Sequence, residues 1–195
     1  MQQMTEDQRE IIIVSGLPRS GTSMMMRMLE AGGLPVLTDH VRQADDDNPK
    51  GYFEFEQVKS IARDASWLPQ AEGKVVKMIS ALLRHLPSEH RYRIIFMHRE
   101  MAEILASQRQ MLVRRGEPAG DDDDKMADLF ERHLREVEAW IAQQPNIQVL
   151  HISYNDILRH PGEQAKVLNQ FLGNRLNTHA MVQVVDQALH RQRVE

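Results

Sequence analysis

A short turn bounded by two glycines carries the residue types best suited to chemistry in this 195-residue chain. Gly16 and Gly21 enclose the turn, and Ser23 follows in an apolar helical run. Residues 11–14, directly before the turn, are four branched apolar residues, typical of a strand that is buried on both faces. The N–H groups of such a turn and the positive end of the following helix converge on one anion. We therefore expect a phosphate site here, around which the rest of the chain is organised.

The spacing of these residues is that of a P-loop, G-x-x-x-x-G-x-[ST], with one departure. Nucleoside triphosphatases carry a lysine that reaches the β- and γ-phosphates, and this chain has Thr22 in its place. Phosphoryl transfer relies on the positive charge of that lysine. The third and fourth expected strands also end in His98-Arg99 and Ser153-Tyr154, not in a magnesium-binding aspartate. These features argue against a P-loop nucleotide kinase or NTPase, which stays open as one alternative. A non-catalytic nucleotide-binding protein is the other.

The loop sequence PRSGTS resembles the 5′-phosphosulfate loop of sulfotransferases that use 3′-phosphoadenosine 5′-phosphosulfate (PAPS). Such loops commonly read P-[KR]-[ST]-G-[TS]-[TS]. In that family the basic residue inside the loop replaces the missing lysine, and here that residue would be Arg19. The resemblance implies that PAPS, and its product adenosine 3′,5′-bisphosphate, contact the loop residues Gly16, Pro18, Arg19, Ser20, Gly21, Thr22 and Ser23.

A second segment agrees with the same family. In these enzymes an arginine at a strand end and a serine eight residues later grip the 3′-phosphate, and Arg99 and Ser107 have that spacing. Arginine offers a forked, permanently charged donor and serine a short hydroxyl donor, which suits a terminal phosphate. Taken alone, Arg99 would as readily be a surface or ion-paired arginine. Residues 154–173 resemble the family's C-terminal tyrosine–aspartate–leucine, proline and Phe-Leu-Gly pattern, whose role is largely structural.

The resemblance also implies catalytic residues on the acceptor side. Lys77 falls where sulfotransferases carry a lysine beside the transferring sulfuryl group. The cytosolic small-molecule enzymes follow it with a histidine base two residues on, where this chain has Ile79. In tyrosylprotein-type enzymes a glutamate about eighteen residues beyond the loop glycine serves instead, and that place holds Asp39. Glu54 is a second candidate for the base. The plainer alternative for Asp39 is a helix cap or a solvated loop residue. For Glu54 it is the start of the next helix.

We expect no metal in the nucleotide site. Backbone N–H groups together with Arg19, Thr22 and Ser23 suffice to hold a single 5′-phosphosulfate. The aspartates at 45–47 could suggest a divalent cation, but a solvated loop that caps the next helix is the favoured interpretation. The histidines at 40, 85, 90 and 98 show no metal-ligand spacing on one helix face, so surface or packing roles are expected for them.

Composition narrows the class of protein. Hydrophobic residues make up 42% and charged residues 27%, which is ordinary for a soluble globular domain. The formal net charge of −4 gives no support for a nucleic-acid partner, and the absence of cysteine excludes disulfides and cysteine-ligated zinc. No apolar run approaches the roughly 18 residues of a membrane span. We expect a single cytoplasmic domain over residues 1–195.

The pattern of elements predicts an α/β fold. Strands are expected at residues 11–14, 74–79, 93–97 and 147–154, and helices at 24–29, 55–65, 80–86, 101–115, 130–141, 161–172 and 181–189. Strands that alternate with helices imply parallel β-α units with right-handed crossovers. The fold class is therefore a three-layer α/β/α sandwich with a mainly parallel sheet, P-loop NTPase-like.

The expected partners are the nucleotide and a hydroxyl or amine acceptor. Nothing in the sequence indicates whether the acceptor is a sugar, a lipid, a phenol or a peptide. The sequence also does not indicate an oligomeric state.

Overall fold

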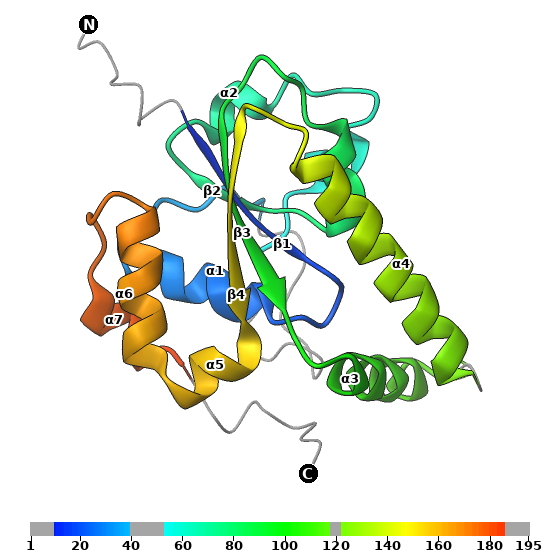
Figure 1. Cartoon of the computed structure of the whole chain (residues 1–195). Helices are drawn as coiled ribbons and strands as arrows, with labels where there is room; N and C mark the ends of the chain where they lie inside the picture. Colours follow the sequence, from blue (N-terminus) through cyan, green and yellow to red (C-terminus); the bar gives the residue numbers. More distant parts are fainter. Residues whose placement is uncertain (1–9, 40–52, 118–121, 186–195) are drawn as a thin grey trace, which may run out of the picture.

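The sheet of the computed structural model, which describes residues 10–39, 53–117 and 122–185, is parallel throughout and has four strands in those residues. Its order is β2-β1-β3-β4, and every neighbouring pair is parallel (Figure 1). The strands are β1 (Ile11–Gly16), β2 (Val75–Lys77), β3 (Tyr92–His98) and β4 (Ile147–Ser153). All four lie where the apolar runs predicted them, and the predicted fold class is confirmed.

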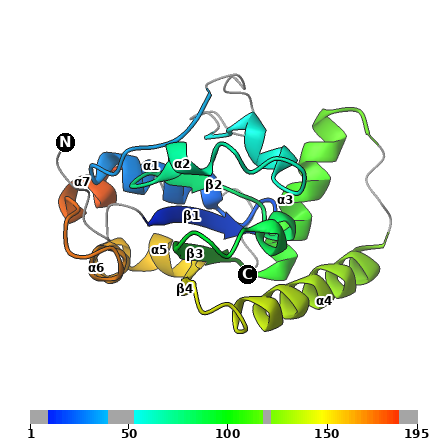
Figure 2. The same ribbon diagram turned by 90° about the horizontal axis from the view of Figure 1, so that it is seen from above.

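Helices cover both faces of the sheet, because alternate residues of each strand point to opposite sides. Ile12 and Val14 of β1 pack in one core with the helices on one face: α1 (Thr22–Ala31), α6 (Pro161–Phe171) and α7 (Thr178–Gln183). Ile11 and Ile13 pack in the other core, with α4 (Asp123–Ile141), α2 (Leu68–Ala71) and the 3₁₀ helices η2 (Glu56–Ser60) and η3 (Ser80–His85). Figures 1 and 2 show the sheet between these two groups.

The helix expected over residues 55–65 is wrong. The structure has only the short 3₁₀ helix η2 there, and a turn follows it. The expectation rested on four apolar residues at helical spacing: Val58, Ile61, Ala62 and Ala65. Val58 and Ile61 are buried, but Ala62 is exposed. An alanine methyl buries little apolar area, at about 25 cal/mol per Å², so two alanines stabilise a second helical turn weakly. Trp67 makes the core contact instead. It is 1% exposed and directly precedes α2.

Two helix starts show how the sequence sets element boundaries. Asp122 caps α4 by accepting a hydrogen bond from the Lys125 N–H at 3.0 Å, and Asp123 and Asp124 add negative charge to the first turn, where it is favourable. Ser153 ends β4 and caps α5 (Tyr154–Arg159), a helix that was not expected. Its hydroxyl accepts from the Asp156 N–H at 3.2 Å, so strand and helix join without a loop.

One further helix matters for the site because of where it begins. Two residues separate the end of β3 from the start of the helix α3 (Met101–Arg114). The aspartates at 45–47 and the end of the last expected helix, beyond residue 185, lie outside the described residues. Within the described ranges, no helix has both the length and the apolar character needed to cross a membrane.

Candidate functional site

The turn after β1 has a backbone shape that depends on its glycines. Gly16 has φ 147° and Gly21 has φ 97°, both in the range that favours glycine. A Cβ on Gly16 would lie 2.6 Å from the Ser20 hydroxyl and 2.7 Å from the Met97 carbonyl oxygen, and one on Gly21 would overlap the ring of Tyr154. The two glycines therefore allow the loop to lie directly against β3 and against the start of α5.

The start of α1 provides donors for an anion. Gly21 is the N-cap and has no side chain to bond the first N–H groups of the helix, so no side-chain cap is made there within the described residues. Thr22 and Ser23 open the helix. The hydroxyl of Ser20 is fully buried and has no hydrogen-bond partner in the part of the chain that the structure describes. The residues of the loop thus fit a phosphate group held by backbone N–H groups and short hydroxyls.

Arg19 and Arg99 connect the loop to the end of β3. Arg19 has φ 70°, a left-handed conformation that costs a residue with a side chain about 1–2 kcal/mol. Its carbonyl accepts a hydrogen bond from Arg99 Nη1 at 3.1 Å, and its own Nε donates to Ser107 Oγ at 2.9 Å. The structure therefore brings together three residues that the sequence placed in two separate phosphate motifs.

A buried network fixes the direction of Arg99. Its Nε donates to Glu103 Oε2 at 2.8 Å, and the two side chains are only 8% and 4% exposed. Glu103 Oε1 accepts from Asn155 Nδ2 at 3.1 Å. The guanidinium carbon of Arg99 lies 4.4 Å from the ring centre of Tyr154, a cation–π distance. Sequence reasoning missed Glu103, although a glutamate four residues after an arginine, at the start of an expected helix, is an ion-pair signal.

Positive charge gathers around Tyr154. Burial raises the pKa of the Tyr154 hydroxyl and the Glu103 carboxylate adds to that rise, whereas the guanidinium groups of Arg99, Arg27 and Arg19 oppose it. Three arginines are thus close enough to one buried ring to act on its titration. Such a concentration of fixed cations attracts an anionic ligand to this end of the sheet.

Lys77 lies beside the loop at the end of β2, whereas Arg99 directly follows β3. Lys77 is the last residue of β2, and its Nζ donates to Ser23 Oγ at 3.2 Å. Because Ser23 is in the first turn of α1, the ammonium group is held at the mouth of the turn. The structure therefore places Lys77 together with the loop residues.

Asp39 and Glu54 lie on irregular backbone, outside the helices and strands. Val36 bridges Val75 of β2 in parallel, so the segment that contains Asp39 runs toward the same end of β2 as Lys77. The Asp39 N–H donates to the Glu54 carbonyl at 3.2 Å, which joins the two candidate bases through their backbones.

The Asp39 carboxylate has a structural contact. Its Oδ2 accepts from the Glu56 N–H at 2.6 Å, at the start of η2. This is the capping role that the sequence left open as the alternative for Asp39. The Glu54 carbonyl also accepts from Thr38 Oγ1 at 2.9 Å, so the two short segments form one hydrogen-bonded patch.

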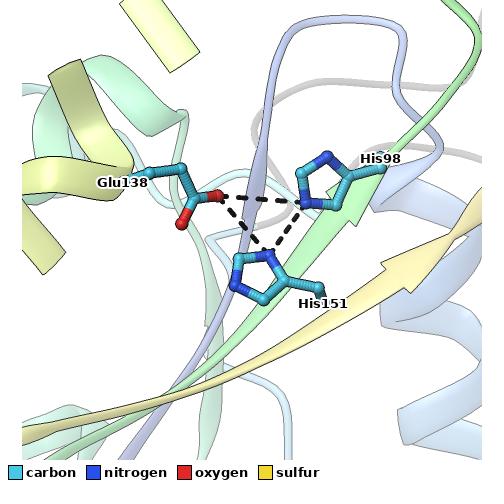
Figure 3. Close-up of side chains that lie close together, drawn as sticks. All are labelled: His98, Glu138 and His151. Atoms are coloured by element: carbon cyan, nitrogen blue, oxygen red, sulfur yellow. Dashed lines mark hydrogen bonds and ion pairs between the residues drawn. The ribbon is translucent and has the colours of Figure 1, made fainter. Parts of the chain in front are cut away.

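A second cluster of ionisable side chains was not expected from the sequence. His98 at the end of β3, His151 of β4 and Glu138 of α4 point toward one another (Figure 3). His98 Nε2 lies 2.9 Å from His151 Nδ1. Burial, and secondarily the neighbouring His151, lowers the pKa of His98. The three residues come from three elements, so no local spacing could have revealed them.

Comparison with known proteins gives one family and one fold. The model of the sulfotransferase family matches residues 50–177. Two solved structures share the fold at 15% sequence identity. One is sulfotransferase STF1 from Mycobacterium tuberculosis H37Rv, with TM-score 0.58 over 95% of this chain and 74% of that one. The other is the sulfotransferase domain from the curacin biosynthetic pathway, with TM-score 0.53 over 91% and 78%. No curated protein matches the sequence.

Proposed function

Because this chain belongs to the sulfotransferase family, we propose that it transfers a sulfuryl group from PAPS to a hydroxyl or amine acceptor. The observation that carries the proposal is the hydrogen-bonded unit of Arg19, Ser107 and Arg99. It joins the glycine turn, suited to a 5′-phosphosulfate, to a buried arginine that suits a second phosphate. A nucleotide with phosphates at both its 5′ and 3′ positions matches two such adjacent sites.

Each part of the donor has candidate ligands in this chain. The loop N–H groups, with Thr22 and Ser23, would hold the 5′-phosphosulfate, and Arg99 and Ser107 would hold the 3′-phosphate. The buried Ser20 hydroxyl and the close approach that Gly16 permits support this fit. Glu103 has a positioning role, because its ion pair aims the Arg99 guanidinium.

In the proposed reaction the sulfur–oxygen bond to the 5′-phosphate breaks as a new bond forms between sulfur and the acceptor oxygen or nitrogen. Negative charge develops on the bridging oxygen, so fixed cations next to it act mainly in the transition state. Arg19 and Lys77 are the residues that would supply that charge. The acceptor proton passes to a carboxylate, for which Asp39 and Glu54 are the candidates.

The donor part of the proposal is tested by a thermal-shift panel with adenosine 3′,5′-bisphosphate, adenosine 5′-monophosphate, ADP, ATP and GTP. A ligand that binds only the native state raises the melting temperature. We expect the largest shift with adenosine 3′,5′-bisphosphate. A larger shift with ATP or GTP would support the nucleotide kinase alternative instead.

Magnesium separates the same two alternatives. The described strands β3 and β4 end in His98 and Ser153 and supply no aspartate for magnesium at those ends. We therefore expect adenosine 3′,5′-bisphosphate to bind equally well with and without added Mg²⁺, measured by titration calorimetry. A strict requirement for Mg²⁺ would contradict the proposed donor.

The transfer itself is tested by incubating the protein with radiolabelled PAPS and panels of phenols, sugars, lipids and peptides. Label in one acceptor class is the expected result. Tight nucleotide binding without labelling of any class would favour a non-catalytic nucleotide-binding protein.

A further inference from the structure

Two histidines and a glutamate meet on the face of the sheet that α4 covers. In the register of β3 and β4, Phe96 is opposite His151, so His98 is a diagonal neighbour of His151. Both histidines share the strand face of Phe96, which belongs to the core beneath α4. Glu138 follows Val137, one of the α4 residues buried in that core. The backbone of three elements therefore directs the three side chains to one point (Figure 3).

The distances are those of atoms around a common centre. His98 Nε2 and His151 Nδ1 are 2.9 Å apart, and Glu138 Oε1 lies 3.5 Å from His151 Nδ1 and 4.0 Å from His98 Nε2. Ligands about 2.0–2.1 Å from a zinc ion lie about 2.9 Å apart at right angles and about 3.3 Å apart in a tetrahedron. The three measured separations bracket these values, so one ion can contact all three atoms after small side-chain movements.

Hydrogen bonds alone would satisfy only part of this cluster, whereas a bound cation would contact all three groups. One imidazole can donate to the other at 2.9 Å, which satisfies one pair of atoms. The carboxylate oxygen, at 3.5 and 4.0 Å, is beyond the usual 2.7–3.2 Å of an N–H···O hydrogen bond to either ring. A cation that takes a lone pair from each ring and from the carboxylate uses all three groups at once.

The ligand types indicate the class of ion. Neutral imidazole suits zinc, copper, iron and nickel, whereas magnesium and calcium prefer oxygen ligands alone. Two histidines and one carboxylate also leave coordination positions for water. The side chains of His98, Glu138 and His151 are 41%, 37% and 43% exposed, so an ion can enter from solvent.

We propose that His98, Glu138 and His151 bind one divalent transition-metal ion of the zinc class. The ion would tie α4 to the ends of β3 and β4. His98 directly precedes Arg99, so the metal site adjoins the proposed 3′-phosphate site through the backbone. The proposal stands on the cluster alone and does not depend on the proposed transfer reaction.

The test is a zinc titration of the untagged full chain after it has been stripped with a chelator. A competing chromophoric chelator reports the affinity, and a thermal melt reports stabilisation by the bound ion. We expect one Zn²⁺ per chain, a higher melting temperature with Zn²⁺, and no comparable effect of Mg²⁺. His151→Gln and Glu138→Gln should each weaken Zn²⁺ binding by about 100-fold or more, since loss of even a residue that only supports a ligand costs about 10–100-fold.

Matched controls remove the same groups elsewhere. His90→Gln replaces a histidine outside the cluster, and Glu136→Gln replaces an exposed glutamate of the same helix. Both should bind Zn²⁺ like the unchanged protein. Circular dichroism checks that each variant is folded, and the half-exposed positions should tolerate glutamine. The proposal is overturned if the stripped protein binds no Zn²⁺, or if His151→Gln and Glu138→Gln bind it as tightly as the controls do.

Discussion

The donor side and the acceptor side of the proposed site are built in different ways. On the donor side, Arg99 and Glu103 are buried, and their ion pair is fixed by Asn155 and Tyr154. These residues come from the end of β3, from α3 and from α5, which are regular elements. On the acceptor side, Asp39 and Glu54 lie on irregular backbone that is joined by a few backbone hydrogen bonds.

The difference suggests a division of labour between the two sides. A buried network in which each charge has a partner holds one geometry, which suits a ligand that does not vary. Irregular segments tolerate changes in sequence and length, so they suit the part of a site that sets specificity. We infer that the nucleotide side is rigid and that the acceptor side carries the features specific to this protein.

The largest effect expected comes from the acceptor side. Of Asp39→Asn and Glu54→Gln, one should lower kcat by roughly 10²–10⁴, because it removes the group that accepts the acceptor's proton. Nucleotide affinity should be unchanged in both variants, measured by calorimetry beside the kinetic assay. Glu72→Gln, at the other end of β2, is the matched control. If both variants turn over normally, the base lies elsewhere.

Lys77→Ala should lower kcat by about 10²–10³, the usual loss when one group that stabilises transition-state charge is removed. Adenosine 3′,5′-bisphosphate binding should weaken much less, because the loop N–H groups and Arg99 remain. Steady-state kinetics and calorimetry on the same preparation separate the two quantities. Lys74→Ala, just before β2, controls for the loss of a lysine, and equal losses of rate and affinity would deny Lys77 a transition-state role.

Arg99→Ala should weaken adenosine 3′,5′-bisphosphate binding by about 1.5–3 kcal/mol, the range for a hydrogen bond to a charged group. Adenosine 5′-monophosphate, which lacks the 3′-phosphate, should bind almost as before. Arg135→Ala removes an exposed arginine of α4 and should change neither affinity. Equal losses for the two nucleotides would remove the 3′-phosphate assignment.

The smallest effect should follow Glu103→Gln, which keeps the shape of the side chain and removes its charge. The Arg99 guanidinium loses its ionic partner, and we expect about 1–2 kcal/mol less stability in urea unfolding. Affinity for adenosine 3′,5′-bisphosphate should fall by a smaller factor than in Arg99→Ala. Unchanged stability and affinity would show that Arg99 is aimed by other contacts.

Much of the fold was predictable because the central strands β1 and β3 are buried on both faces along most of their length. Such strands read as continuous apolar runs, and every residue of β1 is indeed buried. The helix expected at 55–65 was wrong because two of its four apolar positions were alanines. The helix α5 was missed because Ser153 caps it directly at the strand end, with no loop to mark a boundary.

The candidate site shows the same limit: its short motifs were visible in the sequence, and its long-range contacts were not. The loop and the Arg99–Ser107 pair are short motifs, so the sequence displays them, and the structure brings them together. The group of His98, Glu138 and His151 depends on strand register and on how α4 packs, and its two histidines are 53 residues apart. Contacts of that kind become visible only once the elements are in place.

Tyr154 also sets the order in which the site can be completed during protein synthesis. The glycine turn leaves the ribosome first, whereas the ring that packs on Gly21 and on Arg99 belongs to a helix that is made long after it. The central strand β1 likewise waits for β3, which is made much later. A nascent chain halted before β4 therefore carries the whole phosphate motif in its sequence without the ring that buttresses it. Nucleotide binding should thus arise only after α5 has emerged, long after the glycine turn itself has been made.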